Sequence, residues 1–278
     1  MNILAIVVIY NPNIIALQEN IRSFYKDVGQ LIIWDNSNSE NGTHDYTMIP
    51  LLFPEAIYLK QEENMGISKA LNYAWKYARE RDYDTLLTMD QDSKFVAFKL
   101  YIDNVKAWWK NNGCCLCGPT PNLAAEPSPY SSFEKVSDVI TSGMLVPIRL
   151  LEIAGGYNED FFVDGIDIDL CINLRKKGYD TYQDLGSSLI QNYGIPLRKN
   201  ILGKDIFITY YPSDRICQIF RNHIIILRKY SYPRDLLKKI FKRYFIGIYL
   251  KSAIFVRKNR FTNLIAIIKG IYQGFTYK

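Results

Sequence analysis

The chain has 278 residues, of which 48% are hydrophobic and 22% are charged, a balance typical of one large globular domain or of a domain with an appendage. Five cysteines without framework spacing, and only two histidines, argue against a disulfide scaffold and against a Cys/His metal centre. The first residues lack the basic region and cleavage site of a signal peptide, and no stretch reaches the about 18 apolar residues of a membrane span. We therefore expect a cytoplasmic protein.

The net charge of +6 is distributed unevenly along the chain. Residues 231–278 contain eleven Lys or Arg and one acidic residue, Asp235, which gives this segment a charge of +10 and leaves −4 for the remainder. A mildly acidic body with a strongly basic tail predicts that the tail contacts an anionic partner.

The first half of the chain alternates apolar strand patterns with helical periodicity. The predicted elements are a strand over residues 3–10, a helix over 14–26, a strand from 30, a short strand from 56, a helix over 68–83 and a strand over 84–90. Alternating strands and helices predict right-handed βαβ units and a mostly parallel sheet.

The second half changes character along its length. We expect a helix over residues 99–112, a loop over 119–132, then a strand, a short helix, a Gly-Gly turn and an acidic loop that leads into another helix. After about residue 215 the pattern becomes helical, basic and rich in aromatic residues. We therefore predict an α/β domain over residues 1–215 and a basic helical region over 216–278.

Three of the predicted strands end in polar clusters, Tyr10-Asn11-Pro12, Asp35-Asn36-Ser37 and Asp90-Gln91-Asp92. Ligands of open α/β sheets bind beyond the carboxyl ends of the strands, so we expect all three clusters to line one crevice. The sequence contains neither a dinucleotide-binding glycine fingerprint after the first strand nor a P-loop.

Two acidic clusters are candidates for chemistry. Asp90 and Asp92 are hard oxygen donors of the kind that hold Mg²⁺ or Mn²⁺ together with substrate phosphates, although two acidic residues in a solvated loop are the plainer reading. In the second cluster, Asp160, Asp164, Asp167 and Asp169, the last two fall near a helix start, where carboxylates commonly cap the helix. A partly desolvated Asp167 would instead serve as a general base.

Five motifs occur in an order that resembles the family 2 glycosyltransferases, most closely their bacterial rhamnosyltransferase branch. They are Asp35-Asn36-Ser37, "ENMGISKALN", "MDQDS", "TSG" (141–143) and "GGYNEDFFVDGIDIDLCINLRKKGY", and the resemblance spans about four-fifths of the chain, from residue 3 to residue 230. It implies a GT-A fold, which is a Rossmann-like α/β domain with a mostly parallel central sheet flanked by helices, here with a basic C-terminal helical extension.

The resemblance also implies roles for individual residues. Asp167 matches the catalytic base, and Asp164, Arg215 and Arg221 match positions that contact the acceptor or the diphosphate. Asp90, Asp92 and Gln191 correspond to metal-site positions, with Mg²⁺ or Mn²⁺ as the cofactor. The implied nucleotide- and donor-binding residues are Tyr10, Asn11, Pro12, Asp35, Asn36, Asn64, Gly66, Lys69, Asp90, Gln91, Thr141, Ser142 and Gly143.

One position departs from the family pattern. Relatives usually have a histidine in the segment that corresponds to "SLIQNYG", and here the matching residue is Gln191. An amide is a poorer ligand for a transition metal than an imidazole. Weaker metal binding, a preference for Mg²⁺, and loss of the aligned role are the three readings of this change.

Residues 234–270 mix aromatic and aliphatic residues with regularly placed Lys and Arg, which favours amphipathic helices on an anionic membrane surface. The alternative is a helical cap with solvated charges, and no nucleic-acid recognition motif supports a third reading. Together with the resemblance, the pattern predicts a peripheral protein on the inner face of the plasma membrane, acting on a lipid-linked saccharide.

The predicted activity is an inverting, metal-dependent transfer of a sugar, with rhamnose favoured, from dTDP-rhamnose or a UDP-sugar to a growing cell-surface glycan. One alternative is a catalytically silent relative that acts as a membrane-bound scaffold. A second is a UDP-hexose or galactofuranose transferase. A nucleotidyltransferase would need a Gly-rich basic loop after the first strand, and "VVIYNPN" has none.

Overall fold

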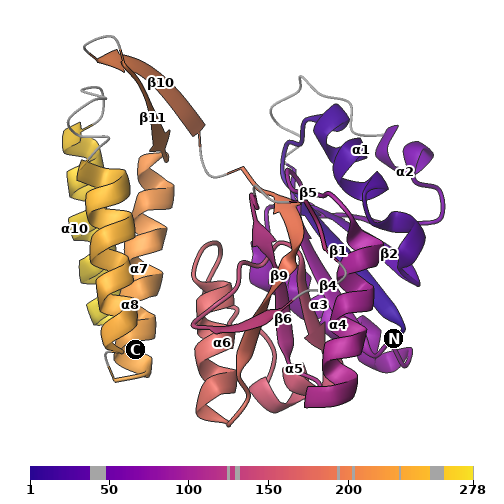
Figure 1. Ribbon diagram of the computed structural model, residues 1–278. Coiled ribbons are helices and arrows are strands. Elements are labelled where there is room, and N and C mark those ends of the chain that lie inside the picture. Colours follow the sequence, from indigo (N-terminus) through magenta and orange to yellow (C-terminus); the bar gives the residue numbers. More distant parts are fainter. Residues whose placement is uncertain are drawn as a thin grey trace. The chain divides into compact units, whose positions relative to one another are not determined.

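The computed structural model describes residues 1–37, 48–123, 126–128, 132–192, 195–201, 204–231, 233–250 and 260–277 (Figure 1). The chain forms two compact units. The first contains residues 1–162 and 166–192, and the second contains residues 163–165 and 193–278. The predicted domain boundary at residue 215 falls inside the second unit.

The described part of the first unit is built on one nine-stranded sheet with the order β3-β2-β1-β4-β8-β6-β9-β5, in which β7 also pairs with β9. The strands are β1 Ile3–Ile9, β2 Gln30–Asp35, β3 Ile57–Lys60, β4 Thr85–Asp90, β5 Lys94–Phe95, β6 Leu116–Pro121, β7 Phe133–Val136, β8 Met144–Pro147 and β9 Thr181–Ile190.

Most strands of this sheet point the same way. The strands β3, β2, β1 and β4 are parallel neighbours, and β6 and β9 share their direction because β8 lies antiparallel between β4 and β6. The strands β5 and β7 pair antiparallel with β9. The expectation of an α/β fold with a mostly parallel sheet is confirmed.

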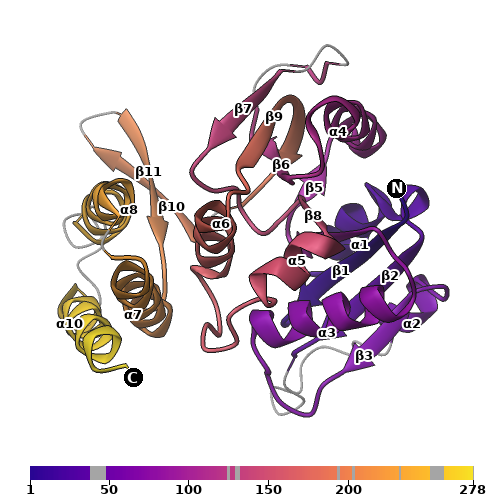
Figure 2. The same cartoon turned by 90° about the horizontal axis from the view of Figure 1, so that it is seen from below.

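Helices cover both faces of the sheet (Figure 2). Alternate residues of β1, such as Ala5 and Val7, pack in one apolar core with side chains of α1 and α4, while α3 packs on β1 and β4. The helical elements of this unit are α1 Ile14–Arg22, η1 Tyr25–Asp27, α2 Met48–Leu52, α3 Ile67–Glu80, α4 Phe98–Asn112, α5 Ile148–Ala154 and α6 Ile166–Lys176.

The predicted loop over residues 119–132 begins too early. Residues 119–121 belong to β6, and the irregularity between Pro119 and Thr120 is a place at which a strand tolerates proline. The register between β6 and β9 shifts after the pair Pro119–Asp184, and the next pair is Thr120–Ser188. Residues 185–187 therefore bulge out of β9.

The buried carboxylate of Asp184 holds this bulge. It accepts hydrogen bonds from the Gly186 amide (2.9 Å), the Ser187 hydroxyl and the Asn104 side-chain amide (3.1 Å). Beyond the bulge, β9 continues and pairs with the short strand β5 through Ile190 and Leu189. The bulge thereby brings the end of β9 beside the residues that follow β4.

The second unit contains a hairpin and a set of helices, and the expected helical pattern after about residue 215 is present in its described residues. The elements are β10 Ile195–Ile201, β11 Lys204–Tyr210, α7 Ser213–Lys229, α8 Arg234–Lys239, the π-helix η3 Ile240–Leu250 and α10 Arg260–Thr276. The sequence reading missed the β10–β11 hairpin.

The helices α7 and α10 pack closely around a small apolar core that includes Ile216, Ile219 and Ile267. The contact is close enough that a Cβ at Gly270 would meet the backbone carbonyl of Cys217. Within the described ranges, no helix combines the length and hydropathy that a membrane span requires.

Candidate functional site

The three polar strand ends meet at one edge of the first unit's sheet, as the sequence predicts. The Tyr10 amide donates to Gln91 Oε1 (2.7 Å), and Gln91 Nε2 donates back to the Tyr10 carbonyl (3.2 Å), which joins the ends of β1 and β4. The Asn11 amide donates to the Ser37 hydroxyl (2.9 Å), which joins the ends of β1 and β2. Parallel pairing of β1 with both neighbours causes this convergence.

Asp35 is fully buried at the end of β2, and both of its carboxylate oxygens have partners. Its Oδ1 accepts from the Ser37 amide (2.8 Å), and its Oδ2 accepts from the Tyr58 hydroxyl and lies 3.3 Å from Lys60 Nζ. Burial, followed by the hydrogen bond to Asp35, raises the pKa of Tyr58 above its usual value.

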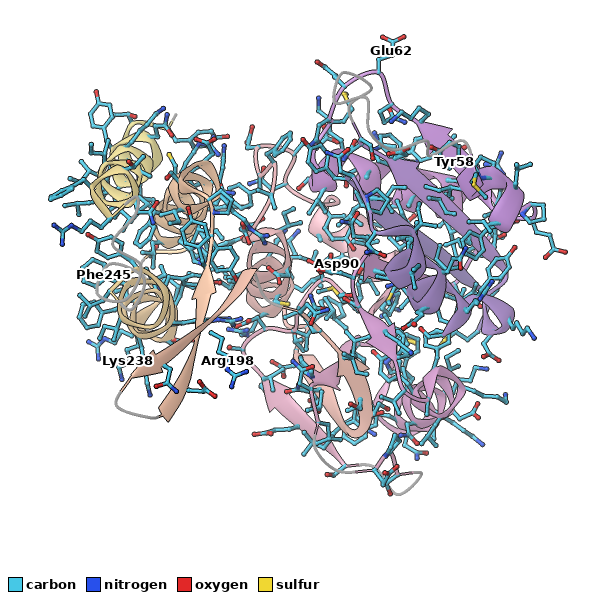
Figure 3. The ribbon with its side chains drawn as sticks, turned by 90° about the horizontal axis from the view of Figure 1, so that it is seen from above. Tyr58, Glu62, Asp90, Arg198, Lys238 and Phe245 are labelled. Atoms are coloured by element: carbon cyan, nitrogen blue, oxygen red, sulfur yellow. The ribbon has the colours of Figure 1, made fainter. Side chains whose placement is uncertain are left out.

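Tyr58 and Lys60 were not among the residues predicted from the sequence. Both lie on β3, and Lys60 is the register partner of Asp35 (Figure 3 labels Tyr58). The sequence signal that could have identified Lys60 is a basic residue at the end of the strand that follows Asp35. Using it required the register between the two strands, which the sequence pattern does not supply.

The segment before α3 is shaped by amide side chains. Asn36 Oδ1 accepts from the Met65 amide (3.1 Å), Asn36 Nδ2 donates to the Gly66 carbonyl (3.2 Å), and Asn64 Oδ1 accepts from the Gly66 amide (3.0 Å). Gly66 has a φ of +79°, and a Cβ there would lie 2.8 Å from the Phe162 ring. Lys69 is exposed on the first turn of α3.

The start of α3 is tied to the residues that precede α6. The Ile67 amide donates to the Phe162 carbonyl (2.8 Å), and the Ser68 hydroxyl donates to the Phe161 carbonyl (2.7 Å). One turn later, Asn72 exchanges hydrogen bonds with the backbone of Tyr157 (2.8 and 2.9 Å). The Asn64–Gly66 loop and the acidic segment therefore share one support.

The end of β4 and the residues just after it carry two of the predicted metal-site residues, Asp90 and Asp92. Asp90 is half-buried, Asp92 is exposed, and Ser93 is buried (Figure 3 labels Asp90). Asn20, a buried residue of α1, donates to the carbonyls of Asp90 (2.7 Å) and Ser93. In the residues that the structure describes, no cluster of three or more His, Cys, Asp or Glu could hold a metal ion by protein ligands alone.

Two further segments reach the end of β4. Ser142 Oγ accepts from the Asp90 amide (3.1 Å) and donates to Ser93 Oγ (2.7 Å). From the end of β9, Gln191 Oε1 accepts from Ser93 Oγ, and Gln191 Nε2 donates to Asp90 Oδ2 (3.3 Å). The structure thus brings Ser142 and Gln191 to Asp90, as expected for one site.

Thr141 and Gly143 flank Ser142 just before β8. The Gly143 amide donates to the Thr88 carbonyl (2.8 Å), and its own carbonyl accepts from the Tyr101 hydroxyl (3.0 Å). Gly143 is buried with a φ of +82°, and a Cβ there would lie 2.7 Å from the Pro119 ring. These contacts fix the predicted sugar-site segment against β4.

Asp167 lies in the first turn of α6, as predicted, and is half-buried. Its Oδ1 accepts from the Ile168 amide (2.8 Å), so the carboxylate is oriented by the helix start. Asp169, in the same turn, is buried. Burial raises the pKa of the Cys171 thiol to about 12, which removes this cysteine as a nucleophile at neutral pH.

The predicted acceptor or diphosphate residues Asp164, Arg215 and Arg221 belong to the second unit. Arg215 donates two hydrogen bonds to the Asp164 carboxylate, Nε to Oδ2 at 3.0 Å and a terminal nitrogen to Oδ1 at 3.1 Å. Asn222 donates to the Asp164 carbonyl (2.9 Å), and Arg221 lies over the Tyr277 ring. Asp164 and Arg215 form a pair, and Arg221 donates to Asn222 Oδ1 (2.8 Å), the side chain that holds the Asp164 carbonyl.

Solved structures of other proteins define the fold of the chain. The chain superimposes on a crystal structure of GalNAc-T7 with UDP, GalNAc and Mn²⁺ with a TM-score of 0.59 and 10% identity, over 82% of this chain and 48% of that one. It superimposes on S. aureus TarS 1–349 in complex with UDP-GlcNAc with a TM-score of 0.57 and 13% identity, over 98% of this chain and 82% of that one. The chain has the GT-A glycosyltransferase fold and spans about half of the GalNAc-T7 chain.

A sequence relative narrows the class. The chain is 26% identical to the dTDP-rhamnosyl transferase RfbF of Shigella flexneri, over 99% of this chain and 97% of that protein. No family profile matches the chain. The chain is thus similar to a rhamnosyltransferase over nearly its full length and shares the GT-A fold, and it is a nucleotide-sugar glycosyltransferase of the hexosyltransferase class.

Proposed function

We propose that this glycosyltransferase moves a hexosyl group, with L-rhamnose favoured, from a nucleoside-diphosphate sugar to a lipid-linked saccharide of a cell-surface glycan. The observation that carries the proposal is the meeting of the polar ends of β1, β2 and β4 at one edge of the sheet. The relative RfbF is named a dTDP-rhamnosyl transferase, which supports a dTDP-linked donor. The TarS structure holds UDP-GlcNAc, so UDP-sugars belong in every test.

Donor binding is assigned to the residues of that edge. Asp35, Asn36 and the Asn64–Gly66 loop border the nucleotide, and Thr141, Ser142 and Gly143 line the sugar. Asp90 and Asp92 fit a divalent ion because Mg²⁺ and Mn²⁺ are usually held by one or two carboxylates together with substrate phosphates. When bound there, the ion supplies neutralisation of the charge on the leaving nucleoside diphosphate.

Asp167 is assigned as the general base. Its carboxylate takes the proton of the acceptor hydroxyl while the hydroxyl oxygen forms a bond to the anomeric carbon. The bond between that carbon and the diphosphate oxygen breaks, and its electron pair leaves with the diphosphate. Attack from the face opposite the leaving group inverts the anomeric configuration. The half-buried position of Asp167 at a helix start supports this role, because the side chain is oriented there.

The test has two parts that need no known acceptor. Calorimetry with dTDP and with UDP, each with and without Mg²⁺ or Mn²⁺, measures metal-dependent nucleotide binding. A hydrolysis screen over dTDP-rhamnose and UDP-hexoses then measures slow donor turnover. We expect metal-dependent binding and turnover of at least one donor, with dTDP-rhamnose strongest. Binding that is absent under all conditions would instead support a silent scaffold.

The same proposal places the protein on a membrane surface through its second unit. The helix α10 turns Asn263, Ala266, Ile267, Gly270 and Gly274 into the unit. Its opposite side forms the outer stripe of α10, whose members are each between 50% and 68% exposed: Phe261, Ile265, Ile268, Tyr272 and Phe275. Their spacing of three or four residues keeps them on one helical face.

The positive charge around the outer stripe supports an anionic lipid surface as its partner. The helix α10 contains Arg260 and Lys269 and no acidic residue, and residues 231–278 as a whole have a charge of +10. Apolar side chains next to cations are the pattern of helices that lie in a membrane interface. A peripheral position on the inner face of the plasma membrane would give the enzyme access to lipid-linked saccharides.

Vesicle sedimentation tests this part separately. The full chain is expected to sediment with vesicles that contain phosphatidylglycerol, less with pure phosphatidylcholine, and less at high salt. The triple variant Phe261→Ser, Ile265→Ser, Ile268→Ser should lose binding, while the control Ile15→Ser with Leu51→Ser, which removes equally exposed residues of the first unit, should retain it. Unchanged binding by the triple variant, or a stable dimer that the same substitutions dissolve, would contradict the membrane proposal.

A further inference from the structure

Four hydrogen bonds form a closed ring around the end of β4, which we call the Asp90 ring. The Asp90 amide donates to Ser142 Oγ (3.1 Å), and Ser142 Oγ donates to Ser93 Oγ (2.7 Å). Ser93 Oγ donates to Gln191 Oε1, and Gln191 Nε2 donates to Asp90 Oδ2 (3.3 Å). The ring joins β4, the segment before β8 and the end of β9, and both of its serines are buried.

The ring fixes which way the Gln191 amide faces. In the ring, the Ser142 hydroxyl donates to Ser93 Oγ, and the Ser93 hydroxyl donates to Gln191 Oε1. If the amide were turned over, its NH₂ group would face Ser93, and the Ser93 proton would have to be redirected. The Gln191 carbonyl would then face the Asp90 carboxylate, an acceptor against an acceptor. Hydrogen-bond networks of this kind are the basis on which amide orientations are assigned.

The backbone around Gln191 is held as well. The Gln191 amide donates to Asn122 Oδ1, and Asn122 Nδ2 donates to the Gln191 carbonyl, both at 3.0 Å. Asn192 Nδ2 donates to the Asp92 carbonyl (3.3 Å), and Asn20 holds the Asp90 carbonyl from the other side (2.7 Å). Turning the amide therefore requires breaking the ring within a segment whose ends are fixed.

The orientation decides what Gln191 can do for a cation. The carbonyl oxygen is the side-chain atom of glutamine that ligates hard cations, and here it accepts from Ser93. The atom that faces Asp90 is an amide nitrogen, whose lone pair is delocalised and whose protons point at the carboxylate. Metal-ligating carboxylates are commonly held by such hydrogen bonds from neighbouring groups.

We propose that Gln191 is a positioning residue, not a metal ligand: it donates a hydrogen bond to Asp90 and holds that carboxylate in the orientation that binds the cation. This inference rests on the proposed function, in which Asp90 and Asp92 bind a divalent ion. It assigns the role of Ser93 and Ser142 too, since they orient the amide. It also explains how an amide serves at a position where the resembling family usually has histidine.

A single substitution separates the two roles by the sign of its effect. Gln191→Glu replaces the donor with a second carboxylate. If Gln191 were a ligand, the added charge would tighten Mn²⁺ binding. If Gln191 positions Asp90 by donation, the two carboxylates repel each other, the ring breaks, and Mn²⁺ binding weakens, by about 10- to 100-fold as for other groups that support metal ligands.

The measurement is Mn²⁺ affinity in the presence of dTDP or UDP, by calorimetry or by the Mn²⁺ electron spin resonance signal, which needs no turnover. Ser93→Ala is the second variant: it removes the donor that occupies Gln191 Oε1, and we expect weaker Mn²⁺ binding, whereas release of a ligand oxygen would strengthen it. Gln183→Glu adds the same charge at the other end of β9 and should leave Mn²⁺ affinity unchanged. Thermal unfolding verifies that each variant is folded.

The outcomes distinguish this inference from the proposed function. Metal-dependent nucleotide binding by the unaltered protein, with weaker Mn²⁺ binding by Gln191→Glu and Ser93→Ala, supports both. The same binding by the unaltered protein, with tighter Mn²⁺ binding by either variant, overturns the positioning role and leaves the proposed function standing. Absence of metal-dependent binding by the unaltered protein overturns both.

Discussion

The strand-end site of the first unit and the helix α10 of the second unit reverse the usual distribution of polar and apolar groups in opposite ways. At the strand ends, Asp35, Ser93 and Ser142 are buried, and each has hydrogen-bond partners. On α10, the outer stripe leaves large apolar side chains exposed. A buried polar group is tolerated when it is hydrogen-bonded, and an exposed apolar face is commonly a contact surface.

The strand-end site and the outer stripe of α10 suit different kinds of partner. The strand-end groups are fixed by backbone and side-chain hydrogen bonds, so little ordering is needed when a small polar ligand binds. The outer stripe has no comparable polar pattern, and its members share only a helical face and nearby cations. The first region is suited to recognise a molecule, whereas the second is suited to lie against a surface.

The largest effect is expected from removal of the proposed general base in the first unit. Asp167→Asn keeps the shape of the side chain and removes the base, so kcat for sugar transfer should fall by about 10²–10⁴-fold while donor binding is retained. Steady-state transfer and calorimetric nucleotide binding measure the two quantities. Asp103→Asn, an exposed residue of α4, is the charge-matched control and should behave like the unaltered protein. Normal turnover by Asp167→Asn would refute the assignment.

A smaller effect is expected from a substitution in the Asn64–Gly66 loop, which packs against Phe162. Gly66→Ala places a side chain at φ +79° and ψ 175°, a conformation that essentially only glycine adopts, at a cost of about 1–3 kcal/mol. The new Cβ would also lie 2.8 Å from the Phe162 ring. We expect a lower free energy of unfolding, measured by urea denaturation.

Gly113→Ala is the matched control for that change. Gly113 has a similar backbone conformation, φ +83° and ψ 160°, but nothing lies within 4 Å of its Cβ position. It should show the backbone cost alone, so the difference between the two variants isolates the contact with Phe162. Equal destabilisation by both variants would mean that the loop moves away from Phe162 at little cost.

The smallest effect is expected from an ion pair of the second unit. The Asp164–Arg215 pair is bidentate but partly exposed, so a double-mutant cycle with Asp164→Asn and Arg215→Gln should give a coupling of about 0.2–1 kcal/mol that decreases with salt. Urea denaturation at low and high salt measures it. The exposed Lys99–Asp103 pair, with 3.9 Å between its charged atoms, should couple more weakly. A coupling for Asp164–Arg215 that is no larger than for this pair would contradict the importance of its geometry.

Much of the first unit could be predicted from the sequence because its first half is locally encoded. The apolar run of β1, the helical spacing of Ile14, Leu17 and Ile21, and the polar residues at the end of β4 each identify an element without reference to the rest of the chain. The right-handed βαβ rule then places the strand ends together. The order of motifs supplied the fold family, and the shared fold and the sequence relative agree with it.

Local periodicity and composition were enough to predict the parallel half of the sheet, the meeting of its strand ends and the basic character of the second unit. The folded chain was needed to show that Lys60 lies beside Asp35, and that Gln191, 98 residues after Ser93, completes the Asp90 ring. The physical reason is that these contacts depend on strand register and on the bulge at Asp184. A one-residue change in register would redirect every side chain beyond it, and no local pattern records which register is chosen.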